Sequence, residues 1–175
     1  MKYLENESIR LRALEPEDID LLYKWENDTS LWETGSTLAP YSKFALKEYI
    51  KDARFDLFSL RQLRLMIELK DDGRRVAGMI DLYDFDPHHN RAGVGILIDP
   101  VCQKKGIACQ SLRILERYVF DFLHLHQLFA YVPNENAASL RLFEKAGYQP
   151  AGILKEWLCV RDRWIDVTIM QRITD

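Results

Sequence analysis

The stretch that first suggests chemistry is Gln103–Ala108, with the sequence QKKGIA, which follows the apolar run Val94–Ile98 and precedes a helical pattern. A strand that passes into a helix through such a loop leaves backbone N–H groups of the first helical turn without partners, and these groups attract anions. The loop therefore indicates a site for a phosphorylated ligand. Gly106 alone is a weak signal, because a glycine there also serves a tight connection. Neither GxxxxGK[ST] nor GxGxxG occurs in the chain, which excludes a P-loop and a dinucleotide fingerprint.

A second block, NENAASLRLFEKAGY at 134–148, adds weight to this interpretation. Asn136, Ser139 and Phe143 are spaced by three and four residues, so on a helix they share one face. The start of this helix is a second N-terminus that favours negative charge. We expect two helix starts to converge on one ligand.

The hydrophobic pattern predicts the elements that position these blocks. Alternating residues predict a first strand over 9–13, and helical spacing predicts a helix over 15–28, a loop over 29–40 and a second helix over 42–56 with Ser42 as its N-cap. Three antiparallel strands, a helix, a strand, a helix and a terminal hairpin follow at 62–70, 75–86, 91–98, 107–122, 126–133, 134–148 and 152–173. This order predicts an α+β fold, a mixed and mostly antiparallel sheet flanked by helices, as one domain over 1–175.

Composition narrows the classes of partner. The formal net charge is −3 and no basic run is present, so we expect no nucleic-acid partner. No stretch has the apolar character of a signal peptide or a membrane span, which favours a cytoplasmic protein without a membrane partner. Cys102, Cys109 and Cys159 are odd in number and lack zinc spacing, so we expect reduced thiols and no metal.

At these residues the chain resembles a known family. QKKGIA is similar to the Q/R-x-x-G-x-G/A pyrophosphate loop of the GCN5-related N-acetyltransferases (GNAT), and NENAASLRLFEKAGY is similar to the helix that follows it in that family. The two blocks occur in order and at matching spacing, and the resemblance covers nearly the whole chain. It is closest to the branch of spermidine and ribosomal-protein alanine acetyltransferases, and it implies the acyl-CoA N-acyltransferase fold.

The resemblance implies an acetyl-CoA site with no metal. The backbone of the third antiparallel strand would pair with the pantetheine arm, and the loop and both helix starts would hold the phosphates. Lys104, Lys105 and Arg141 would meet CoA phosphates, although each is equally explained as solvated charge. The residues that the resemblance assigns to acetyl-CoA are Ile96, Leu97, Ile98, Gln103, Lys104, Lys105, Gly106, Ile107, Ala108, Asn136, Arg141 and Phe143.

Catalysis in this family is direct attack of a neutral amine on the thioester, and the chain departs from the usual pattern at two positions. Phe143 stands where many relatives have a tyrosine acid, and Gly93 stands where they have a glutamate. The resemblance offers Ser139 as a substitute acid, while capping or helix-internal hydrogen bonding is the alternative. Asp81 and Asp84 are the nearest matches for a base, one of them acting through water.

The acceptor stays open between a polyamine or other small amine and a protein N-terminal α-amine. Deprotonating an amine of pKa near 10.4 at pH 7 costs roughly 4.6 kcal/mol, against about 1 kcal/mol for an α-amine, so the missing glutamate disfavours a polyamine. Acids on the presumed acceptor side favour a cation, or are scattered surface charges. They are Glu26, Asp28 and Glu33, with Asp84 and Asp86 beside them.

Two further alternatives follow from the same residues. Phe143 and Gly93 are also compatible with a non-catalytic domain that binds or senses acyl-CoA. Relatives are often dimers, and Trp157 and Trp164 in the terminal hairpin would supply apolar interface area for a homo-oligomer. A place for these tryptophans in the core explains them equally well.

Overall fold

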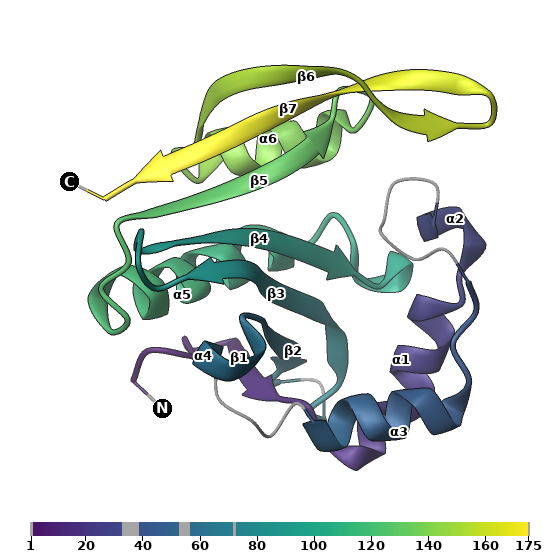
Figure 1. The fold of residues 1–175 in the computed structure, drawn as a ribbon. Coiled ribbons are helices and arrows are strands. Elements are labelled where there is room, and N and C mark those ends of the chain that lie inside the picture. Colours follow the sequence, from purple (N-terminus) through teal and green to yellow (C-terminus); the bar gives the residue numbers. More distant parts are fainter. Residues whose placement is uncertain (1, 33–38, 53–56, 72, 175) are drawn as a thin grey trace.

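The computed structural model describes residues 2–32, 39–52, 57–71 and 73–174. Its centre is a seven-stranded sheet with the strand order β1-β2-β3-β4-β5-β7-β6 (Figure 1). The β4–β5 pair is parallel, and the other five neighbouring pairs are antiparallel. Helices cover both faces, so the predicted α+β architecture is confirmed.

The strands and the longer helices lie where the sequence predicts them. Two short helices, α2 and α4, were not predicted, because one helical turn carries too few residues to show a period. Part of the predicted loop and of the second helix, 33–38 and 53–56, lies outside the described residues. The elements are β1 (Ile9–Ala13), η1 (Pro16–Asp18), α1 (Ile19–Glu26), α2 (Thr29–Trp32), α3 (Lys43–Asp52), α4 (Leu57–Leu60), β2 (Leu63–Leu69), β3 (Val76–Asp86), β4 (Arg91–Ile98), η2 (Pro100–Cys102), α5 (Ile107–Asp121), β5 (Gln127–Pro133), α6 (Ala137–Lys145), β6 (Gln149–Val160) and β7 (Arg163–Ile173).

Local signals account for the helix ends. The Ser42 hydroxyl accepts the Ala45 amide at 3.1 Å at the start of α3, so this predicted cap is confirmed. Gly147 has φ +91° directly after α6. The following Tyr148 amide returns to the Phe143 carbonyl at 3.0 Å, which is the glycine-terminated ending that the sequence predicts.

Alternation along the strands gives the sheet two apolar faces. Even-numbered residues of β4 and of the middle of β3 face α5 and α6 and belong to the larger core, which Ala77 and Phe85 join near the register shifts at the two ends of β3. The larger core includes Ile80, Leu82, Val94, Leu112, Leu115, Leu128 and Phe143. Odd-numbered residues of the same strands face α1 and α3, where a smaller core contains Leu22, Trp25, Leu46, Met66 and Met79. We call the second surface the α1 face.

A buried carboxylate fixes α1 to the end of β4. Asp99 follows β4 directly and is 5% exposed. Its side chain accepts hydrogen bonds from Lys24 Nζ at 2.7 Å and from Trp25 Nε1 at 3.1 Å. The position of α1 over the sheet is therefore set by the same residue that ends β4.

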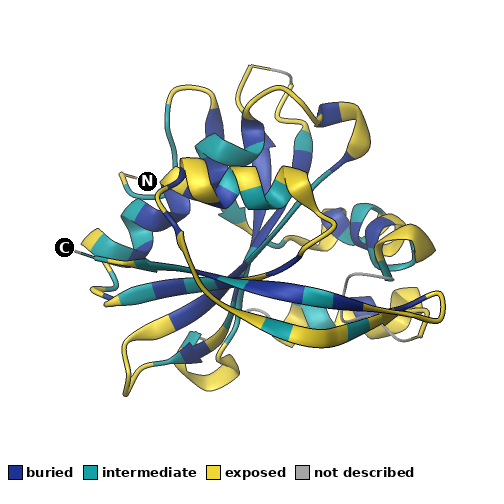
Figure 2. Cartoon of the chain, turned by 90° about the horizontal axis from the view of Figure 1, so that it is seen from above, coloured by how far each residue is buried: buried dark blue, intermediate teal, exposed yellow. Residues whose placement is uncertain are grey.

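The terminal hairpin β6–β7 forms one edge of the sheet and is unevenly covered. β6 is exposed along most of its length, whereas β7 has several buried residues (Figure 2). Trp157 is 58% exposed and Trp164 is 63% exposed. These tryptophans therefore lie on the surface and not in the core.

Candidate functional site

The central feature of the sheet is a split between its two parallel strands. In the part of the chain that the structure describes, β4 and β5 pair only through Arg91 with Gln127, Ala92 with Leu128, and Gly93 with Phe129. Beyond these pairs the strands diverge (Figure 1). We call the space from Val94–Ile98 on β4 to Ala130–Pro133 on β5 the split, with its narrow end at Gly93.

The register of β4 shows which backbone groups face the split. The Asp99 amide donates to the Ala77 carbonyl opposite it at 2.9 Å. Opposed residues of an antiparallel pair alternate between bonding each other and facing away, and the β3–β4 register is continuous from Ile98 to Gly93. The backbone of Ile96 and Ile98 therefore faces the split, as does the Val94 carbonyl. Leu97 is the exception among the predicted residues, because its backbone faces β3 and its side chain packs in the core of the α1 face.

The same alternation applies on β5. The Asn134 amide donates to the Asp166 carbonyl opposite it at 3.0 Å, continuing the β5–β7 register. The backbone groups of Tyr131 and Pro133 consequently face β4. Both margins of the split thus present strand edges, and an extended chain with amide groups fits between them.

The wide end of the split carries the loop predicted to bind phosphate. Gly106 is the N-cap of α5 with φ +74°, so no side chain occupies the amides of the first turn. A Cβ built on Gly106 would meet nothing within 4 Å. The Gln103 side chain donates to the Ile98 carbonyl at 3.2 Å and closes the end of β4. These features leave an open cradle of N–H groups, which fits a pyrophosphate.

The remaining loop residues lie as the sequence suggested. Lys104 and Lys105 are exposed, and Lys104 adopts φ +61°. Ile107 turns its side chain into the core and is 6% exposed, while Ala108 is half-buried. Because β4 and β5 are parallel, α5 and α6 both begin at the wide end, and the two helix starts converge there as expected.

The predicted site residues at the start of α6 and along it differ in exposure and in structural role. The Asn136 side chain accepts the Ser139 amide at 3.0 Å, so it serves as the helix cap. Arg141 is exposed, and Ser139 is half-buried in the first turn. Phe143 is 3% exposed and packs edge-on against Tyr148, with ring centroids 5.0 Å apart. The structure places Phe143 in the core, away from the surface of the split.

On the α1 face, Arg64 joins two of the predicted acids. Its guanidinium contacts both carboxylate oxygens of Asp81, at 2.7 to 3.2 Å. Its Nη1 lies 2.6 Å from Glu26 of α1. Burial raises the pKa of Asp81, and the charge of Arg64 opposes that rise. Asp81 lies beside Gly95 at the split, but its charge is already balanced.

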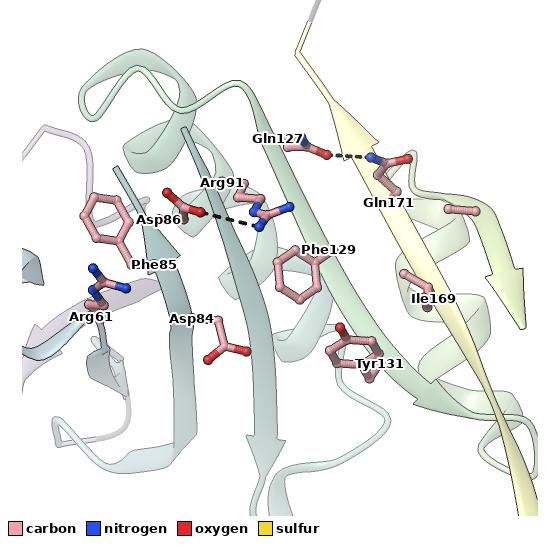
Figure 3. A pocket seen from close by; sticks show the side chains of 11 residues that line it. Arg61, Asp84, Phe85, Asp86, Arg91, Gln127, Phe129, Tyr131, Ile169 and Gln171 are labelled. Atoms are coloured by element: carbon pink, nitrogen blue, oxygen red, sulfur yellow. Dashed lines mark hydrogen bonds and ion pairs between the residues drawn. The ribbon is translucent and has the colours of Figure 1, made fainter. Parts of the chain in front are cut away.

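Asp84 occupies a different environment. It is exposed, adopts φ +48° at an irregularity in the β3–β4 register, and has no ion-pair partner within the described segments. Left-handed conformations of residues other than glycine are costly and are concentrated at functional sites. Asp84 lines a hollow of about 510 Å³ on the α1 face, at the narrow end of the split, together with Arg61, Phe85, Asp86, Arg91, Gln127, Phe129, Tyr131, Ala151, Ile169 and Gln171 (Figure 3).

The other predicted acids have local structural roles or lie outside the description. The Asp28 side chain accepts the amide and hydroxyl of Ser30, and these hydrogen bonds lower its pKa. Asp86 accepts the amides of His88 and His89 in the β3–β4 turn, each at 3.0 Å. Glu33 lies outside the described residues.

Sequence reasoning missed two residues of the site, Arg64 and Tyr83. Arg64 stands opposite Asp81 in the β2–β3 register, so counting back from the hairpin turn would have paired these opposite charges. A Cβ on Gly93 would lie within 3.0 Å of the Tyr83 ring. The space that a glutamate, expected from the family resemblance, would occupy at this position is therefore filled by a ring from the neighbouring strand.

The described ranges contain no group of three or more His, Cys, Asp or Glu side chains placed to hold a metal ion. They also contain no helix whose length and apolar character would let it cross a membrane.

Comparison with known proteins agrees with this geometry. A family model described as an acetyltransferase (GNAT) domain matches residues 8–149. The spermidine N(1)-acetyltransferase of Escherichia coli K12 is 30% identical over 147 residues, which are 84% of this chain and 76% of that protein.

Solved structures extend the match over nearly the whole chain. The spermidine N-acetyltransferase of Vibrio cholerae, in complex with CoA and spermine, is 27% identical with a TM-score of 0.83, and the match covers 96% of each chain. A dodecameric structure of the V. cholerae enzyme has 28% identity and a TM-score of 0.79, covering 96% of this chain and 95% of that one. With most of its length matched by the family model, this chain belongs to the GNAT family and is an acetyl-CoA-dependent N-acetyltransferase.

Proposed function

We propose that this enzyme acetylates a primary amine of a polyamine such as spermidine, by direct attack on acetyl-CoA within a ternary complex. The observation that carries the proposal is that the split opens, on the α1 face, beside acidic side chains, one of which, Asp84, has no ion-pair partner within the described segments. The Asp84 carboxylate can contact a protonated amine there, beside Arg61 and the Arg91–Asp86 pair that also line the hollow. The relatives named for spermidine, one of them solved with CoA and spermine, support the same acceptor class.

Acetyl-CoA fits the split from one end to the other. The cradle at Gly106 would take the pyrophosphate, and the free edge of β4 at Ile96 and Ile98 would pair with the amides of the pantetheine arm. Val94 to Ile98 spans roughly 13 Å at about 3.3 Å per residue. An arm that starts at the cradle therefore brings the thioester toward the narrow end, beside the hollow that Asp84 lines.

The acids on the α1 face divide their roles according to their partners. Asp81 and Glu26 are held by Arg64 and stabilise the wall of the site. Asp84 is free to attract the ammonium group and, through a water molecule, to accept the proton that the amine must lose before it attacks. Ser139, half-buried and close to the start of α6, is the candidate to protonate the departing thiolate.

We further propose that the enzyme self-associates through the outer part of the β6–β7 hairpin. Ile153, Trp157 and Trp164 are each more than half exposed there, and large exposed apolar side chains are typical of interfaces. The dodecameric structure of the V. cholerae enzyme supports self-association. The occupant that we propose is a second copy of the chain.

The first prediction concerns the cradle. Gly106→Val should weaken acetyl-CoA binding by at least about tenfold, because the side chain fills the space through which the backbone reaches the phosphates. Isothermal titration calorimetry measures the change. Gly73→Val is the matched control, since Gly73 also has φ above zero and open space but lies in the β2–β3 turn. If the Gly106 variant and the parent protein bound acetyl-CoA with equal affinity, the phosphates would not bind at this loop.

The second prediction tests the acceptor. Release of thiol from acetyl-CoA should be fast with spermidine and slow with N-terminal peptides. Initial velocities over both substrates should give intersecting double-reciprocal lines, because both must be bound before transfer. Turnover with peptides alone would show that the acceptor is an α-amine. Tight CoA binding without turnover of any amine would indicate a sensing domain.

The third prediction concerns Asp84. Asp84→Asn should raise KM for spermidine about fivefold, which corresponds to about 1 kcal/mol for a partly exposed charge, and should leave KM for acetyl-CoA within about twofold. Asp162→Asn is the control, because Asp162 is also exposed with φ above zero but lies at the β6–β7 turn. An equal rise in KM for spermidine and in KM for acetyl-CoA would contradict the assignment of Asp84 to the acceptor site.

The fourth prediction concerns assembly. Replacing Trp157 and Trp164 together by serine should shift the protein to a smaller species in light scattering coupled to size exclusion, since both indoles would lie in the interface. Arg161→Ser, in the intervening turn, provides a polar control. An unchanged mass in the double variant would place the interface elsewhere.

A further inference from the structure

Tyr83 lies at the point where the split begins. It belongs to β3 and stands opposite Gly93, the last residue of β4 that pairs with β5. Its ring packs edge-on against Phe129, the β5 partner of Gly93, with centroids 5.8 Å apart. Because a Cβ on Gly93 would lie within 3.0 Å of this ring, the ring covers β4 and reaches toward β5.

The Tyr83 side chain reaches toward the far strand. The backbone of Tyr131 lies near enough to the Tyr83 phenol to lower its pKa, as an amide N–H directed at a phenol oxygen does. If the parallel ladder continued, the Tyr131 amide would donate to the Val94 carbonyl, because Gly95 would then stand opposite Tyr131. The Tyr83 phenol therefore lies beside the amide at which the ladder stops.

The position of Tyr83 explains why the split opens where it does. The β4 register against β3 runs without a shift from Ile98 to Gly93, so no bulge in β4 accounts for the divergence from β5. Tyr83 accounts for the divergence of β5 from β4 in two ways. Its ring fills the space above Gly93, and its phenol lies near the Tyr131 backbone that the ladder leaves without a β4 partner.

We propose that Tyr83 is a catalytic residue of this chain, whose hydroxyl defines the narrow end of the split and donates a hydrogen bond to the carbonyl oxygen of the acetyl thioester. The inference rests on the proposed placement of acetyl-CoA in the split. A phenol oxygen that faces the Tyr131 backbone still has its own proton to donate. Within the described residues no other group takes that proton, and the Ile96 amide faces the same space as a second donor.

Donation without transfer is the role that fits the hydroxyl. Burial raises the pKa of Tyr83 to about 12, against the Tyr131 backbone that lowers it. The phenol therefore keeps its proton at neutral pH. The hydroxyl instead stabilises negative charge as it develops on the carbonyl oxygen, in the manner of an oxyanion hole.

The test compares Tyr83→Phe with the parent protein. The variant keeps the ring over Gly93 and removes only the hydroxyl. We expect kcat to fall by at least about tenfold, with KM for acetyl-CoA and calorimetric affinity for CoA within about threefold. The Tyr131 amide should also exchange its hydrogen faster. Tyr118→Phe, which removes the hydroxyl of another partly buried tyrosine on α5, should keep parental kinetics.

A second variant disturbs the Tyr83 hydroxyl through the neighbouring residue on β4. Gly93→Ala should displace the ring of Tyr83 and lower kcat, and combining it with Tyr83→Phe should add little further loss, because both changes remove one interaction. Losses that multiply in the double variant would overturn the proposal.

The outcomes separate this proposal from the one on which it rests. Failure of the parent protein to bind CoA would overturn the placement of acetyl-CoA itself. Normal CoA binding with kcat of Tyr83→Phe within about twofold of the parent would overturn the role of Tyr83 alone. Loss of CoA binding in Tyr83→Phe would make its hydroxyl structural and would also overturn the catalytic role.

Discussion

The function of this protein depends on hydrogen bonds that two neighbouring strands do not make. β4 and β5 are parallel and pair through only three residue pairs within the described chain. A buried strand edge is ordinarily unfavourable, because each unpaired amide and carbonyl loses its water without gaining a partner. In the proposed complex, the strand edges at Ile96 and Tyr131 would hold a ligand that brings its own amides, the pantetheine arm of acetyl-CoA. The same geometry sends α5 and α6 away from one end of the split, so the strand edge and the two helix starts proposed to bind acetyl-CoA are parts of one arrangement.

The charges around the split are arranged so that most of them are already neutralised. Arg64 takes both oxygens of Asp81 and also contacts Glu26, which fixes α1 against β2 and β3 and limits the field of these acids. Asp84 differs because the register irregularity of β3 turns it toward the hollow without an ion-pair partner among the described residues. Under the proposed mechanism, the site would attract a cationic amine and then let it lose a proton, for which one carboxylate without an ion-pair partner suits better than several paired ones.

The elements of the fold were largely predictable from the sequence, and the site only in part. Period-two and helical spacing located the seven strands and the longer helices, and Gly106 and Gly147 marked helix ends that the structure confirms. For the residues that the sequence misjudged, the element was predicted correctly, but the direction in which the backbone or side chain faces was not. Leu97 was grouped with Ile96 and Ile98, although alternation turns its backbone to β3. Phe143 shares a helical face with Ser139, yet the packing of α6 on the sheet buries it. Tyr83 left no local signal, because its contact with Gly93 exists only after β3 and β4 have paired.

The contact between Gly93 and Tyr83 makes two positions on adjacent strands mutually exclusive. The volume above position 93 is occupied either by a side chain from β4 or by the ring from β3, and it cannot hold both. Exchanging one for the other therefore requires two coordinated substitutions, since a side chain at 93 alone meets the ring and the loss of the ring alone leaves a void. The pair therefore determines whether a side chain from β3 or one from β4 reaches the narrow end of the split in this chain, and substitutions at the two positions must be considered together.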